Sequence, residues 1–500
     1  MQNHPTWNFD NYCFQYIVSV VAGTLHDWIH SNLFYHFISV EIPLKSEAKQ
    51  DRIDLSQTPE QQGSLLILNI SYFLLINIFL NIYSLAWRIA LPLLKRARRT
   101  SFGWDERIVE TSPSGPFDIW IQAASGGESM LTNMILEELA GTLHSKKTCR
   151  ILVTSGTKEG VDSLKKGKDK LTSDHFDLHI AYFPFDAPFL MKKAFARFSP
   201  TLAVILETEL WPAFLITAKK NNVPVFLVNA RMSDKSAGTY KRFARFFSSY
   251  GPEKIWAISE LDQGRFTEVM GTNTVGIMDN IKFDRITPVH NKPPNPKLLA
   301  LLPEGKPFVL LGSIRREEEE KVVITIKELL FARSDITIGI FPKHITRAKL
   351  WQDLLKKENI VSTKRSEISA DTPPASVIIW DVFGELADAY NLAQTAFVGG
   401  SLVNLGGQNF LEPLVFGLRP IIGPYWRNFG WVGQDIVSSG LVTEVDNENV
   451  LATVLLDQLD QQVDKEVTLD QVQHFFEPKK GGTQFVCQKI TQKLHAIENL

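Results

Sequence analysis

The chain has 500 residues, and at roughly 150 residues per domain this length predicts about three domains, or two large domains and a leader. It has 53 lysines and arginines against 55 aspartates and glutamates. The resulting net charge of −2 excludes the strongly basic surface of a general nucleic-acid binder. Hydrophobic residues make up 44% and charged residues 22%, which excludes disordered and collagen-like classes. The three cysteines, Cys13, Cys149 and Cys487, lie far apart, which excludes a disulfide-rich scaffold and predicts a reducing compartment.

Residues 1–63 show no pattern that predicts a role, and we treat them as an N-terminal extension. Leu65–Trp87 is then a run of 23 residues without a formal charge, long enough to cross a bilayer as a helix. Arg88 and a basic run that ends at Arg99 follow, and this positive charge predicts that the rest of the chain is cytoplasmic. Residues 64–99 are therefore predicted to be a transmembrane anchor and basic linker. The alternative is a buried core helix.

Residues 100–287 alternate short apolar runs with helical patterns, which is typical of a parallel α/β sheet. The strands predicted in this half are Asp118–Ala123, Arg150–Thr154, Leu178–Tyr182, Leu202–Leu206 and Val225–Val228. A segment rich in proline and asparagine, Pro288–Pro296, then predicts a domain boundary.

The same alternation restarts in residues 297–500, which close with a helical tail. The strands predicted here are Phe308–Leu311, Thr337–Phe341, Val377–Trp380, Ala396–Val398 and Pro420–Ile422. The sequence therefore predicts two Rossmann-like, doubly wound domains. Ligands of such sheets bind beyond the carboxyl ends of the strands, so we expect the two domains to face a shared cleft.

The first predicted strand is followed by Ser125-Gly126-Gly127-Glu128 and a helix. The glycines leave the backbone bare where a substrate has to approach, and a carboxylate at Glu128 could accept a proton from an acceptor hydroxyl. Glu128 is thus a candidate catalytic base. The alternative is an acid in the first turn that complements the helix dipole.

Two acids, Glu207 and Glu209, follow the strand Leu202–Leu206 directly, in the sequence ETELWP. Acids beyond a buried strand are costly to desolvate, which predicts that they bind a ligand or a buried cation. Arg231, which follows the next strand in the same way, is a candidate partner. A purely structural ion pair is the alternative.

In the second half, a glycine-rich loop enters a predicted helix and offers backbone N–H groups suited to a phosphate. Glu412, in the first turn of that helix, could accept both hydroxyls of a ribose. Together these features predict a nucleotide site, and a plain tight turn is the alternative. The loop residues predicted to form the site are Gly400, Ser401, Gly407, Gln408 and Asn409.

Basic and polar residues follow two other strands of this half: Ser313 with Arg315, and Lys343 with His344. Cations at strand ends can stabilise a departing phosphate. The part after the anchor has no Asp-x-Asp, so we predict leaving-group stabilisation without a metal ion. The run Glu317–Glu320 is interpreted as a solvated face.

These motifs recur in one order that resembles the family of 3-deoxy-D-manno-octulosonic acid (Kdo) transferases of lipid A biosynthesis. The resemblance covers roughly residues 65–490, and the residues before the anchor lie outside it. The motifs that carry it are SGGE (Ser125–Glu128), ETELWP (Glu207–Pro212), NARMS (Asn229–Ser233), NIKFD (Asn280–Asp284), GELADAY (Gly384–Tyr390) and FVGGSL with GGQNFLEP (Phe397–Pro413).

The resemblance implies a glycosyltransferase of the GT-B fold that moves Kdo from CMP-Kdo to a tetra-acylated lipid A precursor with inversion. It implies an enzyme at the cytoplasmic leaflet of the inner membrane, with no cofactor and no nucleic-acid partner. Glu128 falls on the family's catalytic base, and one of Glu207 and Glu209 on a supporting acid. The residues that fall on the donor-binding side are Lys343, Gly384, Glu385, Leu386, Asn409 and Glu412.

Some positions depart from the family pattern. Gln122 and Arg315 stand where histidine is common or expected, and Lys343 stands where arginine is expected. Lysine keeps the positive charge but lacks the planar fork of arginine, which leaves a bidentate phosphate contact there in question. We expect the charge of the departing CMP to be met by Lys343, by Arg315 and by the N–H groups of the loop Gly406–Asn409.

Two stretches of the first half mix cations with aromatic residues, Phe189–Phe198 and Tyr240–Phe247. Such segments could enter the membrane interface while their cations meet lipid phosphates. Ordinary amphipathic surface helices are the alternative. The cations predicted to face the acceptor or the membrane are Lys192, Lys193, Arg197, Lys241, Arg242 and Arg245, together with Arg231.

Two other functions agree with the sequence. The chain could be another GT-B transferase or an epimerase that uses a UDP-sugar. It could also be a membrane-tethered nucleotide-binding scaffold, although bare nucleotide binding does not require Glu128 or the acids of ETELWP.

Overall fold

A computed structural model describes residues 59–97, 100–142, 148–171, 176–369, 373–461 and 464–498; the side chains of residues 59–75 and 498 are not described. The N-terminal extension predicted for residues 1–63 therefore lies almost wholly outside the described residues. The chain divides into two compact units. The first takes the described residues up to Ile255, with Gly264–Val275 and the chain from Gln492 onward, and the second takes Trp256–Gln263 and Gly276–Thr491.

The first unit is built on a seven-stranded sheet with the strand order β3-β2-β1-β4-β5-β6-β7. The pairings from β3 to β5 are all parallel. The order reverses direction at β1, the point where ligands bind in doubly wound sheets. The strands are β1 (Phe117–Ala123), β2 (Cys149–Ser155), β3 (Phe176–Tyr182), β4 (Pro200–Leu206), β5 (Val225–Ala230), β6 (Lys254–Ala257) and β7 (Val275–Ile277).

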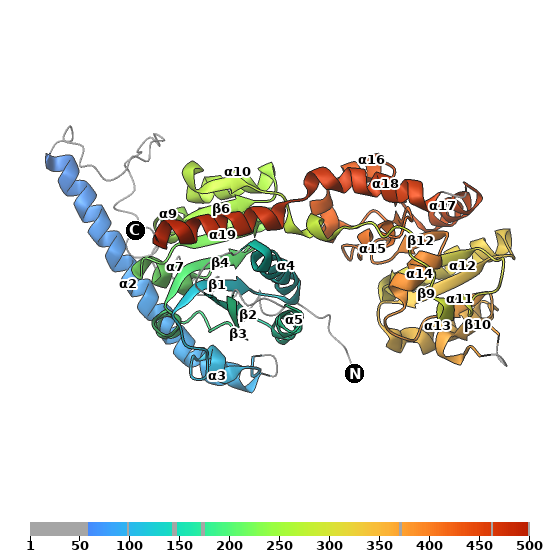
Figure 1. Ribbon diagram of the computed structural model, residues 1–500, viewed down its shortest axis with the longest axis horizontal. Coiled ribbons are helices and arrows are strands. Elements are labelled where there is room, and N and C mark those ends of the chain that lie inside the picture. Colours follow the sequence, from blue (N-terminus) through green and yellow to red (C-terminus); the bar gives the residue numbers. More distant parts are fainter. Residues whose placement is uncertain are drawn as a thin grey trace, which may run out of the picture. The chain divides into compact units, whose positions relative to one another are not determined.

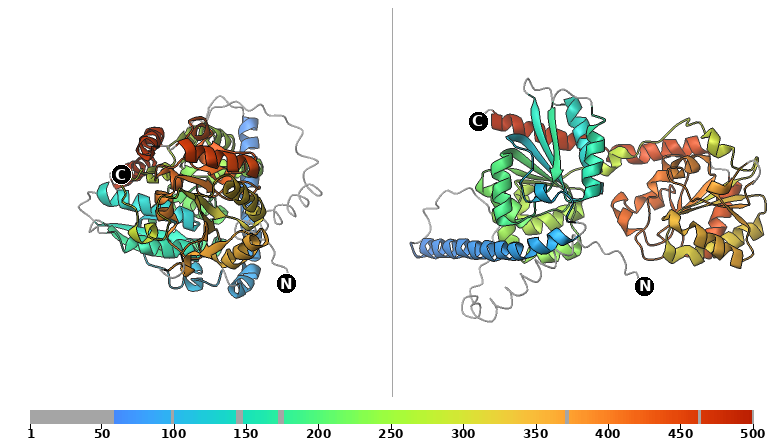
Figure 2. Two further views of the ribbon diagram at one scale, coloured as in Figure 1. Left: turned by 90° about the vertical axis from the view of Figure 1, so that its right-hand side faces the viewer. Right: turned by 90° about the horizontal axis from the view of Figure 1, so that it is seen from below.

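Helices cover both faces of this sheet (Figures 1 and 2). Trp120 of β1 marks one face, because its indole packs against Phe195 of α6 and Phe214 of α7 with ring centroids 5.2 and 5.0 Å away. α4 and α5 pack on the other face, against β1 and β2. The helices of the first unit are α2 (Pro59–Arg96), α3 (Trp104–Arg107), α4 (Gly126–Thr142), α5 (Lys158–Lys168), α6 (Pro188–Phe198), α7 (Pro212–Lys220), α8 (Asp234–Lys241), α9 (Ala244–Tyr250) and α10 (Glu260–Met270).

The second unit has its own seven-stranded sheet, with the order β10-β11-β9-β8-β12-β13-β14 and parallel pairing throughout. Here the order reverses at β8, between β9 and β12. The strands are β8 (Phe308–Ile314), β9 (Thr337–Pro342), β10 (Ser362–Lys364), β11 (Val377–Ile379), β12 (Thr395–Val398), β13 (Ile421–Ile422) and β14 (Thr443–Glu444).

Alternation along β8 sends its side chains into two cores. Val309 and Leu311 join a cluster with residues of α12, α13 and α17, and Phe308 and Leu310 join a cluster with residues of α11 and α14. The helices of this unit are α11 (Pro296–Leu299), α12 (Glu319–Ala332), α13 (Ala348–Lys357), α14 (Leu386–Leu392), α15 (Leu411–Leu414), α16 (Asp435–Ser438), α17 (Glu448–Gln461), α18 (Lys465–Phe476) and α19 (Gly482–Glu498), the last of which extends to residues of the first unit.

Every strand predicted from the sequence is present, so the prediction of two doubly wound α/β domains is confirmed. The sequence missed β6, β7, β10 and β14. Each has at most four residues, too short for an apolar run to stand out.

The predicted anchor lies within α2, a 38-residue helix that is blue in Figure 1. Its segment Ile76–Arg96 is long and apolar enough to cross a membrane by length and composition. The same segment also packs on the first unit. Trp87 lies 5.7 Å from the ring of Phe185, and the buried Tyr83 hydroxyl donates to Asp186 Oδ2 at 3.2 Å. One face of the helix is therefore part of the folded unit.

Candidate active site

Three acidic side chains lie at the carboxyl ends of two neighbouring strands of the first unit. β1 and β4 pair in parallel and so end at the same edge of the sheet. Glu128 lies in the first turn of α4, which follows β1, and Glu207 and Glu209 lie between β4 and α7. The residues predicted to be catalytic thus gather at one edge.

Glu128 is fixed by the turn that precedes its helix. Its Oε2 accepts a hydrogen bond of 2.7 Å from the Ala124 N–H, and its Oε1 accepts one of 3.1 Å from the Ser125 hydroxyl. Only 7% of the residue is exposed. An acid that only complemented the helix dipole would not need this burial, so the arrangement favours a chemical role.

Burial raises the pKa of Glu128 to about 8, and the negative charges of Glu209 and Glu207 add to the rise. Burial also raises the pKa of Glu209 to about 7, again with a contribution from Glu207. A carboxyl group whose pKa lies near neutral pH can take a proton from a hydroxyl and hold it. The geometry and the electrostatics both suit general-base chemistry.

Glu207 and Glu209 have different surroundings. Glu207 Oε2 accepts hydrogen bonds from Arg231 Nε at 3.0 Å and Arg231 Nη2 at 2.7 Å, so the partner predicted from the sequence is present. The Glu207 backbone has a φ of 59°, a left-handed conformation that costs a non-glycine residue roughly 1–3 kcal/mol. Glu209 makes no ion pair within the described part of the chain. The Glu207 carboxylate is therefore held in place by Arg231, whereas the Glu209 carboxylate is available to interact with Glu128 or with a ligand.

Tyr240 is a residue near Glu209 that the sequence did not connect with this site. Burial raises the pKa of its phenol to about 12, and the charge of Glu209 contributes to the rise. The sequence placed Tyr240 in a segment predicted to face the membrane. No local pattern could have shown that α8 brings its ring to the acids that follow β4.

In the second unit, two turns at the ends of β8 and β12 form the core of the predicted donor site. Gly400 and Gly407 have φ values of 73° and 79°, conformations that glycine adopts without strain. The Gly407 N–H donates to the Gly400 carbonyl at 2.8 Å, and the Gln408 N–H donates to the Gly399 carbonyl at 3.0 Å. These two N–H groups are already hydrogen-bonded within the loop, so they are not available to a phosphate. The side chains of Lys343 and Arg315 remain as the predicted phosphate contacts.

The interpretation of Glu317–Glu320 as a solvated face is wrong for its two central residues. Glu318 has an exposure of 0% and Glu319 one of 4%. Glu318 Oε1 accepts the N–H groups of Arg315 at 2.9 Å and Gly400 at 2.5 Å, and Glu319 pairs with Arg347. A charged run gives no sign of such partners, although an acid three residues after Arg315 agrees with a capping pattern.

Glu412 interacts electrostatically with Lys343 and with Tyr390. Burial raises the pKa of Glu412, and the positive charge of Lys343 opposes this rise. Burial also raises the pKa of Tyr390, with Glu412 as a second cause. Lys343 and His344 are exposed at the end of β9, while Asn409 is exposed and its Oδ1 accepts the Leu411 N–H at 3.2 Å. Lys343 and Glu412, both predicted to bind the donor, are thus near enough to interact electrostatically.

Other predicted donor residues have roles within the fold. The Glu385 carboxylate accepts hydrogen bonds from Arg365 at 2.8 and 2.9 Å and from Trp380 Nε1 at 2.8 Å, so it fixes the turn between Gly384 and Leu386, where α14 begins. The buried Ser401 hydroxyl donates to the Val398 carbonyl and accepts the Gly423 N–H, both at 2.8 Å. Ser313 has a φ of 55° near the end of β8.

Several of the cations predicted to face the acceptor or membrane contact the first unit itself. Lys193 Nζ donates to the Ile108 carbonyl at 3.2 Å, Arg197 Nε donates to the Ser112 carbonyl at 2.6 Å, and Lys241 pairs with Glu268 at 2.5 Å. These three therefore have contacts within the fold. The predicted cations that are exposed on α6 and around α8 and α9 are Lys192, Lys193, Lys241, Arg242 and Arg245.

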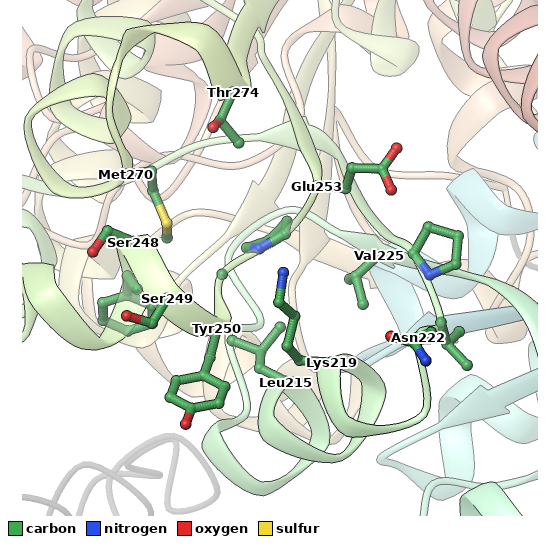
Figure 3. A pocket seen from close by; sticks show the side chains of 15 residues that line it. Leu215, Lys219, Asn222, Val225, Ser248, Ser249, Tyr250, Glu253, Met270 and Thr274 are labelled. Atoms are coloured by element: carbon green, nitrogen blue, oxygen red, sulfur yellow. The ribbon is translucent and has the colours of Figure 1, made fainter. Parts of the chain in front are cut away.

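A cavity of about 340 Å³ in the first unit lies away from these acids. Its lining includes Lys219 at the end of α7, Val225 at the start of β5 and Glu253 just before β6, and Figure 3 shows the Lys219 side chain reaching into it. These residues mark the amino ends of the strands, opposite the edge that holds Glu128. The cavity is therefore separate from the candidate site.

Comparisons with known proteins identify the family. A family model described as 3-deoxy-D-manno-octulosonic-acid transferase (kdotransferase) matches residues 99–285. The chain is also 30% identical over 354 residues to the 3-deoxy-D-manno-octulosonic acid transferase of Aquifex aeolicus, a match that spans 71% of this chain and 88% of that protein. The chain belongs to the 3-deoxy-D-manno-octulosonic acid transferase family.

Two further matches are weaker, one to a relative and one to a solved structure. A bifunctional glycosyltransferase/methyltransferase of Fusobacterium nucleatum is 28% identical over 393 residues, which is 76% of this chain but only 57% of that protein. The crystal structure of a glycosyltransferase from Rickettsia africae aligns with a TM-score of 0.50 at 11% identity, over 76% of this chain and 99% of that one. The latter match agrees with the predicted fold class, two Rossmann-like units of the GT-B type.

Membership of the Kdo transferase family makes the chain a glycosyltransferase. The family model covers the edge of the first sheet that holds Glu128, Glu207, Glu209 and Arg231. Most of the second unit, from residue 286 onward, lies outside that model, so the donor site expected there stays a prediction.

Proposed function

We propose that the protein transfers Kdo from CMP-Kdo to a tetra-acylated lipid A precursor, with inversion at the anomeric carbon. The observation that carries the proposal is the buried Glu128 carboxylate at the carboxyl end of β1, held by two hydrogen bonds and flanked by two further acids. The proposal that the transferred sugar is Kdo comes from the family assignment. The resemblance of the motifs supplies the nucleotide and the acceptor.

The proposed reaction is a direct displacement. An acceptor hydroxyl of the lipid attacks the anomeric carbon of Kdo while Glu128 takes its proton. A new C–O bond forms, the bond between that carbon and the phosphate oxygen of CMP breaks, and CMP leaves with the electron pair. Positive charge on the sugar in the transition state resembles an oxocarbenium ion, which nearby carboxylates favour.

The donor side depends on side chains at the strand ends of the second unit. Lys343 and Arg315 meet the negative charge that develops on the departing phosphate. Glu412 accepts hydrogen bonds from the ribose hydroxyls. Because Lys343 acts as a point charge without the fork of arginine, it contacts one phosphate oxygen at a time.

The membrane location is supported by the exposed face of α2. Large apolar side chains recur on it at the spacing of a single helix face, and at the end of the helix Lys95 and Arg96 are basic. We place this face in the lipid of the inner membrane and the two units at its cytoplasmic side, where the exposed cations Lys192, Arg242 and Arg245 can meet lipid phosphates. The exposed apolar residues of α2 are Ile78, Ile82, Leu85, Ile89 and Leu93.

The test is the substitution Glu128→Gln in the full-length protein, assayed with CMP-Kdo and the lipid acceptor. Loss of the base should lower kcat by about 10²–10⁴ while CMP affinity stays the same. Glu137→Gln, an exposed acid in the same helix, is the matched control and should retain full turnover. A Glu128→Gln enzyme with more than about a tenth of wild-type turnover would remove Glu128 from this role. Binding of UDP but not of CMP would indicate that the donor is a UDP-sugar and not CMP-Kdo.

A further inference from the structure

Glu318 is a buried carboxylate that the proposed reaction does not use. It lies directly before α12, has an exposure of 0% and accepts two backbone N–H groups with the same oxygen, Oε1. One N–H belongs to Arg315, just after β8, and the other to Gly400, just after β12. A single carboxylate therefore connects the turns that follow two adjacent strands.

The turn at Gly399 packs tightly against this carboxylate. A Cβ on Gly399 would lie 2.3 Å from Glu318 Oε1 and 2.8 Å from the Ser313 carbonyl oxygen, so only glycine fits there. The carbonyls of Gly399 and Gly400 in turn accept the N–H groups of Gln408 and Gly407. The position of the whole glycine loop thus depends on the turn that Glu318 holds.

The pKa of Glu318 reflects both its burial and its hydrogen bonds to the two turns. Burial raises the pKa of Glu318, while the N–H groups of Arg315 and Gly400 oppose the rise. A buried carboxylate is retained at a cost in solvation, and the hydrogen bonds it accepts offset that cost only while both turns stay in place.

We propose that Glu318 is a positioning residue that holds the turns Ser313–Arg315 and Gly399–Ser401 in the arrangement that binds the donor nucleotide. The inference rests on the proposed function, since it takes CMP-Kdo as the donor. Glu318 touches neither the sugar nor the phosphate. It places the Arg315 side chain and the glycine loop relative to each other, so its loss should weaken donor binding rather than slow the chemical step.

The experiment compares Glu318→Asp with the wild-type full-length protein, by calorimetric titration with CMP and by steady-state kinetics. Aspartate keeps the charge but is one methylene shorter, so it cannot reach both N–H groups. We expect CMP to bind about tenfold more weakly and the KM for CMP-Kdo to rise by a similar factor, while kcat stays within about threefold. Glu318→Gln keeps the length but not the charge and should weaken CMP binding about threefold.

Glu319→Gln is the matched control, because Glu319 is the adjacent buried acid and pairs with Arg347 instead of the two turns. It should leave CMP affinity unchanged. Wild-type affinity in Glu318→Asp would overturn the inference. If Glu318→Asp does not fold, wild-type affinity in Glu318→Gln would do so. A wild-type protein that does not bind CMP would instead overturn the proposed function, and this inference with it.

Discussion

At the scale of single residues, the main question is which acid assists Glu128. Glu207 is engaged by the Arg231 guanidinium, whereas burial raises the pKa of Glu209 to about 7. Two carboxyl groups with raised pKa values that repel each other share their protons. We therefore assign to Glu209 the role of keeping the pKa of Glu128 high, which makes Glu128 a stronger base once it has lost its own proton.

This assignment predicts the effect of Glu209→Gln on the pH dependence. A protonated Glu128 cannot accept a proton, so kcat/KM should rise with pH through the pKa of Glu128, which is raised to about 8. Removing the negative charge of Glu209 should lower that pKa, and the midpoint of the rise should move down by about half a unit to one unit. The measurement is kcat/KM between pH 5.5 and 9.5. An unchanged midpoint, or one that moves up, would contradict the assignment.

The residues of the first sheet edge could be predicted from the sequence, because each lies in or just beyond the turn that follows an apolar strand. Glu128, Glu207 and Arg231 belong to this class. Tyr240 and Glu318 could not be predicted. Tyr240 reaches the site through the packing of α8, and Glu318 stands in a run of acids whose members differ only in their tertiary partners.

At the scale of elements, Asp186 connects three parts of the first unit. Its Oδ2 accepts the Ala213 N–H at 3.0 Å, and its Oδ1 accepts the Phe214 N–H at 2.8 Å, which caps the first turn of α7. The Tyr83 hydroxyl of α2 donates to the same carboxylate. The turn with Glu207 and Glu209 leads directly into α7, so the cap that fixes this helix also fixes one end of the acidic turn.

We predict that Asp186→Ala lowers the free energy of unfolding by about 1–3 kcal/mol, because two helix N–H groups and the Tyr83 hydroxyl lose their buried acceptor. Thermal unfolding of the full-length protein in detergent measures the change as a lower Tm. Asp162→Ala is the control, since its ion pair with Lys158 is exposed to solvent and its loss should leave the Tm almost unchanged. Equal Tm values for the two variants would contradict the role of Asp186.

Strands could be predicted from the sequence more accurately than the helix α2. Buried parallel strands such as β1, β4 and β8 are continuous apolar runs, and these were predicted within a few residues of their observed ends. α2 was predicted only in part. Its apolar residues were interpreted as one span that ends at Trp87, but the helix continues to Arg96 and turns Tyr83 and Trp87 toward protein. Hydropathy does not distinguish a side chain that faces lipid from one that packs on a neighbouring domain.

At the scale of the whole molecule, the chain consists of two α/β units with different chemistry. The first contains the buried acids and the helix with an exposed apolar face, as expected for the part that meets a lipid acceptor. The second contains the glycine loop with Lys343 and Glu412, as expected for the part that binds an activated sugar. The near-zero net charge and the exposed face of α2 favour a membrane substrate over nucleic acid.

The most direct test of this account is mass spectrometry of the lipid after reaction. The purified full-length protein is incubated with the tetra-acylated lipid A precursor and with CMP-Kdo generated in the same mixture. We predict a gain in lipid mass of one Kdo residue or a whole multiple of it, with CMP released, and no gain with Glu128→Gln. An unchanged lipid mass with the wild-type protein, or an equal gain with Glu128→Gln, would contradict the account.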